Sequence, residues 1–221
     1  MDILAILAAS VEIIGTIAFA LSGSMTGNDR GLDFFGVTVL GAITAVGGGI
    51  TRDILLGRTP PAALIDPKFI IISVLISLIC ILAFNQFAHM LTPEVMSKLM
   101  LSMKISDALG LALFTVSGMN IAIEMGFSEN VFLMVTVGVL TGVGGGLIRD
   151  IFVHKTPMIF TKNIYATAAA VGGILYYFCL KVMPQYAAML IGAGVIVLIR
   201  FIAMYKDLNL PKFNDDDYFF E

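Results

Sequence analysis

The sequence predicts an all-α integral membrane protein with seven transmembrane helices, arranged as two inverted three-helix repeats plus a seventh helix. Three observations support this fold class. The composition is too apolar for a soluble domain, seven apolar stretches are long enough to cross a bilayer, and one sequence block recurs about 97 residues further along the chain.

The composition selects a membrane environment. Hydrophobic residues make up 58% of the chain and charged residues only 13%, whereas soluble domains carry about a quarter charged residues. So little charge cannot cover the surface of a soluble protein. The net charge of −3 argues against a nucleic-acid partner. No metal-ligand, nucleophile–base or phosphate-loop motif is present, so the sequence predicts no enzyme, no cofactor and no bound metal.

The spans are separated by short segments rich in Gly, Pro, Asn and Asp. A single transmembrane domain is expected over 1–206, followed by an acidic tail over 207–221. Each predicted span is close to the roughly 20 residues that a helix needs to cross the hydrocarbon core. The seven spans are 3–24, 34–57, 68–88, 99–120, 131–153, 164–183 and 186–205.

The distribution of Lys and Arg predicts a cell-membrane protein with the N-terminus outside and the C-terminus in the cytoplasm. With this orientation nine basic residues face the cytoplasm and four face outward. When four basic residues inside the spans are discounted, the excess is still six to three.

The duplication is clearest over residues 41–60 and 138–157, where eleven of twenty positions are identical. Both copies contain Gly-Gly-Gly-x-x-Arg-Asp. Repeat one covers about 3–88 and repeat two about 99–183, while the last span has no counterpart. Because each repeat has three spans, the second copy enters the membrane in the opposite orientation. Transport sites in such folds lie near the midplane between repeats.

The two glycine triplets are the first candidate site. Three glycines in one helix favour a kink or an unwound turn, and irregular backbone at membrane depth is tolerated where it lines water or is buried in protein. Two interpretations remain open, a kinked polar pathway and close helix packing through small residues. The residues concerned are Gly47, Gly48, Gly49, Gly144, Gly145 and Gly146.

The charged motif after each triplet is the second candidate. Arg52-Asp53 and Arg149-Asp150 are adjacent residues on a helix and point about 100° apart, so each arginine is expected to need a partner elsewhere.

Two acids inside apolar spans could supply these partners, because ionisable residues in a membrane are costly and usually functional. We therefore predict that Glu12 pairs with Arg52 and that Asp107 pairs with Arg149. Such pairs could line the pathway or could only fix the helices. Lys104 lies one turn before Asp107 and could compete for it, or could extend to the membrane interface.

Four hydroxyl side chains match between the repeats. Thr44 and Thr141 lie one turn before the triplets, and Ser22 and Ser117 lie in the first span of each repeat. They could line a hydrated route or form hydrogen bonds within and between helices.

The doubled Gly-Gly-Gly-x-x-Arg-Asp motif in a seven-span chain resembles the prokaryotic trimeric intracellular cation (TRIC) channels, a family also labelled as a glycine transporter domain. The resemblance covers about 3–205. It implies a homotrimer in membrane lipid, with a pore in each protomer bounded by kinked second and fifth helices and permeable mainly to potassium. The glycine triplets match those kinks.

Three functions are compatible with these features of the sequence. The leading one is a potassium-permeable channel, and the alternative is a secondary transporter of a small amino acid such as glycine. Both use the same fold, so the fold does not choose between them. A membrane scaffold without transport is the third, and it leaves the ionisable residues inside the spans unexplained.

Overall fold

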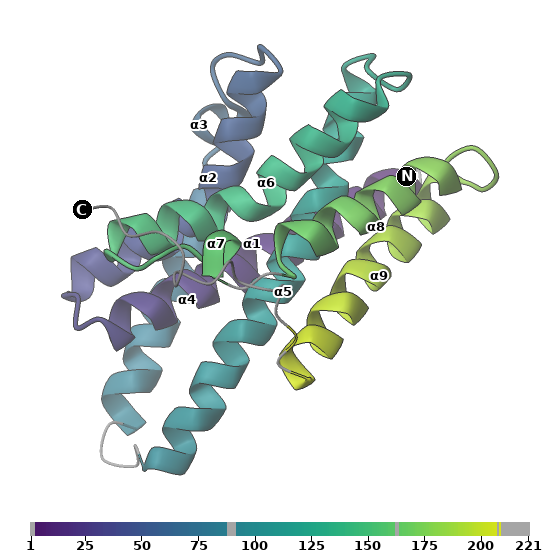
Figure 1. Ribbon diagram of the computed structural model, residues 1–221. Helices are drawn as coiled ribbons and strands as arrows, with labels where there is room; N and C mark the ends of the chain where they lie inside the picture. The colour runs from purple at the N-terminus through teal and green to yellow at the C-terminus, as the bar shows by residue number, and fades with distance from the viewer. Residues whose placement is uncertain (1–2, 88–91, 162–163, 207, 209–221) are drawn as a thin grey trace, which may run out of the picture.

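The computed structural model describes residues 3–87, 92–161, 164–206 and 208, and within these ranges the regular secondary structure is helical throughout (Figure 1). The helices are α1 (Ile3–Asp29), α2 (Phe34–Leu55), α3 (Ala62–Ile65), α4 (Lys68–Phe87), α5 (Pro93–Glu124), α6 (Val131–Phe152), α7 (Met158–Thr161), α8 (Ala166–Cys179) and α9 (Gln185–Tyr205). The predicted tail lies outside the described residues, except for Leu208.

The predicted fold class is confirmed. Six of the described helices are long and apolar enough to cross a membrane, and α8, at 14 residues, is a shorter apolar helix. Each predicted span corresponds to one of these seven. The short helices α3 and α7 were not predicted, because four residues carry no periodic signal. The helices α1 and α5 run beyond the predicted spans, since their ends continue with polar residues.

The two repeats begin their second helices in the same way. Asp33 accepts a hydrogen bond from the Gly36 amide at 2.7 Å and caps α2, and Asn130 accepts one from the Leu133 amide at 3.0 Å and caps α6. These two caps are 97 residues apart, so the duplication extends to the start of each helix.

The repeats pack against each other through reciprocal contacts. Helix α1 lies against α5, and α2 lies against α6. Phe19 packs on Gly110 and Phe114 packs on Gly15, and the two rings meet with centroids 5.3 Å apart. Such exchange of equivalent contacts is what a two-fold relation between inverted copies requires.

The glycine triplets form the crossing of α2 and α6. A Cβ atom added to Gly48 would collide with the backbone oxygen of Thr141, and one added to Gly145 would collide with the backbone oxygen of Thr44. Close helix packing therefore accounts for these two glycines. Both helices continue through their triplets without interruption, so the expectation of an unwound turn was wrong. The ribbon of α2 nevertheless changes direction along its length (Figure 1).

The threonines before the triplets are buried and hydrogen-bonded inside their own helices. Thr44 donates to the Leu40 carbonyl and Thr141 to the Val137 carbonyl, both at 2.6 Å. Their hydroxyl groups also face Gly23 and Gly118 on the neighbouring first helices. These contacts assign both threonines to helix packing, not to a hydrated route.

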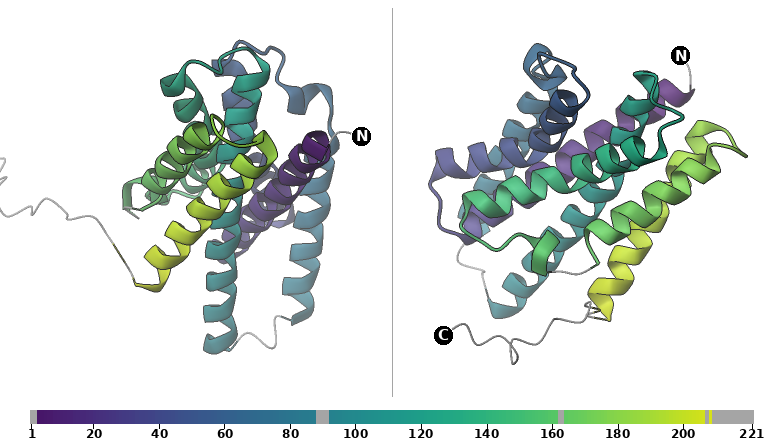
Figure 2. Two further views of the ribbon diagram at one scale, coloured as in Figure 1. Left: turned by 90° about the vertical axis from the view of Figure 1, so that its right-hand side faces the viewer. Right: turned by 45° about the horizontal axis from the view of Figure 1, so that its top comes forward.

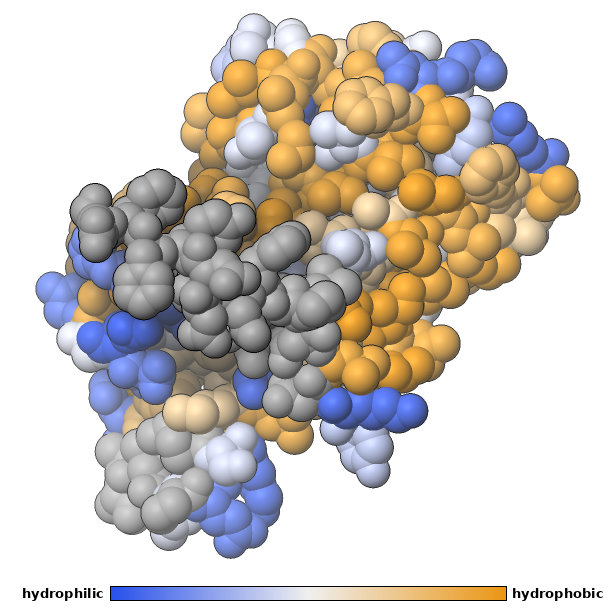
Figure 3. Space-filling model, viewed as in Figure 1, coloured by the Kyte–Doolittle hydropathy of each residue, from blue (hydrophilic) through white to orange (hydrophobic). Residues whose placement is uncertain are grey.

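The hairpin of α8 and α9 lies on one side of the bundle, and both views show the two helices side by side (Figure 2). The face seen in Figure 3 is broadly apolar, with hydrophilic residues gathered towards its edges. Many large apolar side chains point outward, for example Phe132, Val182 and Tyr205, which are 79–90% exposed. Such a surface suits contact with lipid chains.

We predict that Gly48→Ala lowers the free energy of unfolding by about 3 kcal/mol or more, because the methyl group must displace a backbone carbonyl. Thermal unfolding of the purified protein in detergent measures the change. The matched control is Gly49→Ala, because a Cβ at that position would meet Arg52 Nη2 at 3.8 Å, an ordinary contact distance, and no closer side chain of the described residues. This control should be neutral or slightly stabilising. Equal destabilisation by both variants would contradict the close contact of α2 and α6 at Gly48.

Candidate functional site

Arg149 lies at the centre of a fully buried polar cluster. Its Nη1 atom is 2.7 Å from Asp107 Oδ1 and donates to Ser22 Oγ at 2.5 Å, and its Nη2 atom is 2.9 Å from Asp150 Oδ1. The three charged side chains are each no more than 1% exposed. The predicted pair of Asp107 and Arg149 is confirmed. Ser22, which comes from the other repeat, joins it.

Arg52 has a different environment. Its Nε and Nη2 atoms both lie 2.8 Å from Asp53 Oδ1. The predicted pair of Glu12 and Arg52 was wrong, because no contact within 4.0 Å joins these two side chains among the described residues. Glu12 instead accepts a hydrogen bond from Ser117 Oγ at 3.3 Å. Both Glu12 and Arg52 line an open cavity.

Each Arg-Asp motif forms an ion pair between neighbours, which the 100° spacing argument had excluded. The arginine side chain is long enough to fold back along the helix to the next residue. The second oxygen of each aspartate accepts a hydrogen bond from a backbone amide of the following short helix. Asp53 Oδ2 accepts from the Ala62 amide at 2.8 Å, and Asp150 Oδ2 accepts from the Met158 amide at 3.0 Å. Each motif therefore fixes the chain as it leaves α2 or α6.

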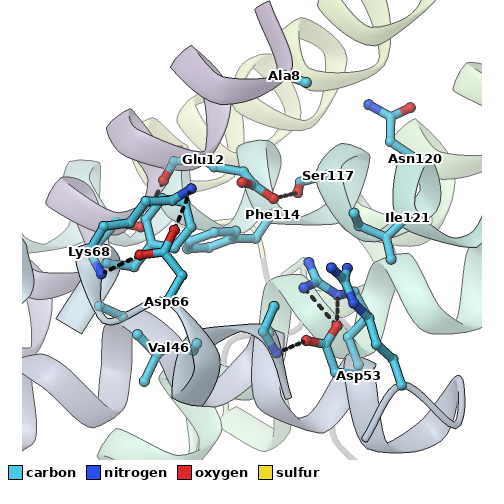
Figure 4. Close-up of a pocket in the computed structure, with 18 of the residues that line it drawn as sticks. Ala8, Glu12, Val46, Asp53, Asp66, Lys68, Phe114, Ser117, Asn120 and Ile121 are labelled. Atoms are coloured by element: carbon cyan, nitrogen blue, oxygen red, sulfur yellow. Dashed lines mark hydrogen bonds and ion pairs between the residues drawn. The ribbon is translucent and has the colours of Figure 1, made fainter. Parts of the chain in front are cut away.

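The cavity beside repeat one has a volume of about 380 Å³. Figure 4 shows Glu12 from α1, Ser117 and Phe114 from α5 and Asp53 from α2 around it. Gly49 also lines this cavity, so the last residue of the first triplet borders open space while its neighbour Gly48 is packed. Close packing therefore accounts for Gly48, and the pathway interpretation stays a prediction for Gly49.

Described residues pack closely against each glycine of the second triplet. Gly144 packs against Gly48, and Gly146 faces the Tyr165 hydroxyl and the Arg149–Asp107 pair. Gly47 packs against Ile148.

Charged side chains surround the cavity. Four are acidic and three are basic: Glu12, Asp53, Asp66 and Glu124, with Arg52, Arg58 and Lys68. Lys68 pairs with Asp66 at 3.0 Å. The hydrogen bonds from Lys68 lower the pKa of Asp66, so this carboxylate stays ionised at neutral pH.

Lys104 is exposed, and no ion pair joins it to Asp107 in the described part of the chain. This position agrees with the interface interpretation. Among the described residues, no three His, Cys, Asp or Glu side chains are grouped to hold a metal ion.

Two buried residues beside the Arg149 cluster were not predicted. Tyr165 lies just before α8, is 2% exposed and directs its hydroxyl group towards Gly146. Arg200 of α9 is 4% exposed and lies over the Tyr165 ring, with its Cζ atom 4.7 Å from the ring centroid. A basic residue in the last span was the only sequence signal for this pair.

Sequence comparison identifies one matching family model and several similar membrane proteins. A family model described as "Glycine transporter" matches twice, over residues 9–85 and 104–181. The UPF0126 inner membrane protein YadS of Escherichia coli K12 is 38% identical over 210 residues, which cover 94% of this chain and 96% of the relative. A UPF0126 membrane protein of Deinococcus radiodurans is 36% identical over 203 residues, 91% of this chain and 89% of that protein.

Two solved structures of TRIC channels superpose on this chain. A prokaryotic TRIC channel crystallised in 0.5 M KCl superposes with a TM-score of 0.82 at 36% identity, covering 93% of this chain and 99% of that one. The TRIC channel of Rhodobacter sphaeroides has a TM-score of 0.80 at 27% identity, with 91% and 98% covered.

We predict that Asp107→Asn and Glu12→Gln differ strongly in stability. Removing the Asp107 charge leaves buried Arg149 with one carboxylate in place of two, and should cost about 3 kcal/mol. Glu12 borders the cavity and forms no ion pair with any residue that the structure describes, so its change should cost less than about 1 kcal/mol. Chemical unfolding of both variants in detergent measures the difference. A Glu12 variant as unstable as the Asp107 variant would contradict the assignment.

Proposed function

This chain belongs to the family of TRIC cation channels and UPF0126 membrane proteins, and from this premise we propose that it is a potassium-permeable channel for monovalent cations. Each protomer contains its own pore, which runs between the inverted repeats. The observation that carries the proposal is the cavity at Glu12, which is lined by four acidic and three basic side chains inside a bundle of apolar helices.

The charge around the cavity favours a cation. Asp53 neutralises Arg52 and Asp66 neutralises Lys68. Glu12 and Glu124 have no basic partner within 4.0 Å in the described residues, and Arg58 is the remaining base. The lining therefore carries a net negative charge, which raises the local concentration of cations.

The route continues from the cavity towards the Arg149 cluster. There the repeat-two side is filled by Arg149, Asp107 and Asp150, each buried. A conducting state requires these side chains to separate, because a permeant ion needs polar groups that are free to replace its water. The structure supports a pore that is open at the Glu12 end and closed at the Arg149 end.

We infer the membrane arrangement from the distribution of Lys and Arg. With the N-terminus outside, Glu12 and Arg52 lie in the outer half of the bilayer, and Asp107 and Arg149 lie in the inner half. We propose a homotrimer embedded in cell-membrane lipid, as the word "trimeric" in the name of the Rhodobacter sphaeroides structure describes for that relative.

We predict discrete unitary potassium currents from the purified protein in a planar bilayer. Glu12→Gln should reduce the unitary potassium current roughly twofold or more, because it removes an uncompensated charge from the cavity. Glu94→Gln is the matched control. This acid is exposed, pairs with Lys98 on the surface of α5 and does not line the cavity, so the current should be unchanged.

Saturable glycine uptake into proteoliposomes, without unitary currents, would contradict the channel and identify a carrier. Equal currents through the wild type and the Glu12 variant would remove this cavity from the conduction route.

A further inference from the structure

The two halves of the molecule differ at one place where the duplication would make them alike. At Gly49 an added Cβ would meet only Arg52 Nη2, at 3.8 Å, and this residue borders the cavity. At the equivalent Gly146 an added Cβ would meet the Tyr165 hydroxyl oxygen at 2.9 Å and Asp107 Oδ1 at 3.4 Å. Tyr165 therefore fills, in repeat two, the position that is open in repeat one.

The residue equivalent to Tyr165 behaves differently. The short helices α3 and α7, and the amides of Ala62 and Met158 that bond to Asp53 and Asp150, are 96 residues apart, so Phe69 corresponds to Tyr165. Phe69 is half-buried and lines the cavity. Repeat one thus also has an aromatic ring at this position, but this ring borders the open space beside Gly49 and does not fill it.

Arg200 holds Tyr165 in this position. Its Nη1 atom donates to the carbonyl of Ile164 at 2.9 Å, and its guanidinium carbon lies 4.7 Å from the centre of the Tyr165 ring. One side chain of α9 therefore fixes both the backbone before Tyr165 and the ring itself. Helix α9 has no counterpart in repeat one, and the residue that α9 contributes to the cavity lining is the apolar Met189.

The packed arrangement leaves polar atoms unsatisfied. Asp107 Oδ2, Tyr165 Oη and Arg200 Nε are buried and lack a hydrogen-bond partner among the described residues. Loosening of the packing around Tyr165 would let water reach these atoms.

We propose that Arg200 is a positioning residue that holds Tyr165 in the inner mouth of the pore, so that the seventh helix sets how often this mouth opens. This inference rests on the proposed channel function. Arg200 acts through Tyr165 and does not itself line the route of the ion.

Single-channel recording of Arg200→Leu tests the proposal. Loss of a desolvated cation–π contact and of the hydrogen bond to Ile164 should raise the ratio of open to closed time by about tenfold or more. The unitary potassium current should stay the same. Arg200→Lys keeps a cation near the ring and should restore most of the closed time.

A double-mutant cycle separates this role from general loosening of the bundle. Tyr165→Leu should increase the open time by a similar factor, and Arg200→Leu added to it should have little further effect. Additive increases, or an unchanged open time in Arg200→Leu with normal thermal stability, would overturn the proposal.

A second measurement does not need ion conduction. In a chain whose Cys80 and Cys179 are replaced by Ala, Ser22→Cys reports access to the buried cluster. Arg200→Leu should speed labelling of this cysteine by a water-soluble thiol reagent by about tenfold. Unchanged labelling overturns the inference. If the wild type gives no currents but Arg200→Leu still speeds labelling, the channel proposal fails and the positioning role of Arg200 is supported.

Discussion

The close crossing of α2 and α6 at Gly48 and Gly145 determines the rest of the structure. With no Cβ on either residue, each helix approaches the other's backbone at the threonine carbonyl of the preceding turn. The contact is reciprocal, so it fixes the two inverted repeats about a shared axis. Arg52 and Arg149 each lie four residues after their central glycine and are therefore carried to opposite ends of the crossing. One backbone contact thus separates the two charged sites.

The two halves of the molecule share this symmetric crossing but differ in the surroundings of their arginines. Asp107, Asp150 and Ser22 surround Arg149 completely, whereas Arg52 has only Asp53 and faces a cavity. The difference follows from two features outside the matched motif. Glu12 replaces the shorter Asp107 and bonds to Ser117, and α9 adds Arg200 to the second half alone. The inverted repeats place a charged site in each half, and the departures from the repeat bury one site and leave the other beside a cavity.

Much of this arrangement could be predicted from the sequence, because hydropathy and duplication act over long segments. The seven helices, the inverted repeats and the pair of Asp107 and Arg149 all follow from patterns longer than one turn. The prediction that Glu12 pairs with Arg52 was wrong, because helical spacing does not reveal that an arginine side chain folds back onto the next residue. Tyr165 and Arg200 were missed because their contact joins two segments that no repeat relates.

We propose that each protomer encloses its own route for cations beside Glu12. Crystals of the protein grown in thallium(I), a potassium substitute with strong anomalous scattering, would locate cations along that route. We expect an anomalous peak inside the cavity, within coordination distance of the Glu12 carboxylate, in every protomer. Peaks confined to the outer surface or to an axis between protomers, with that cavity empty of ions, would contradict it.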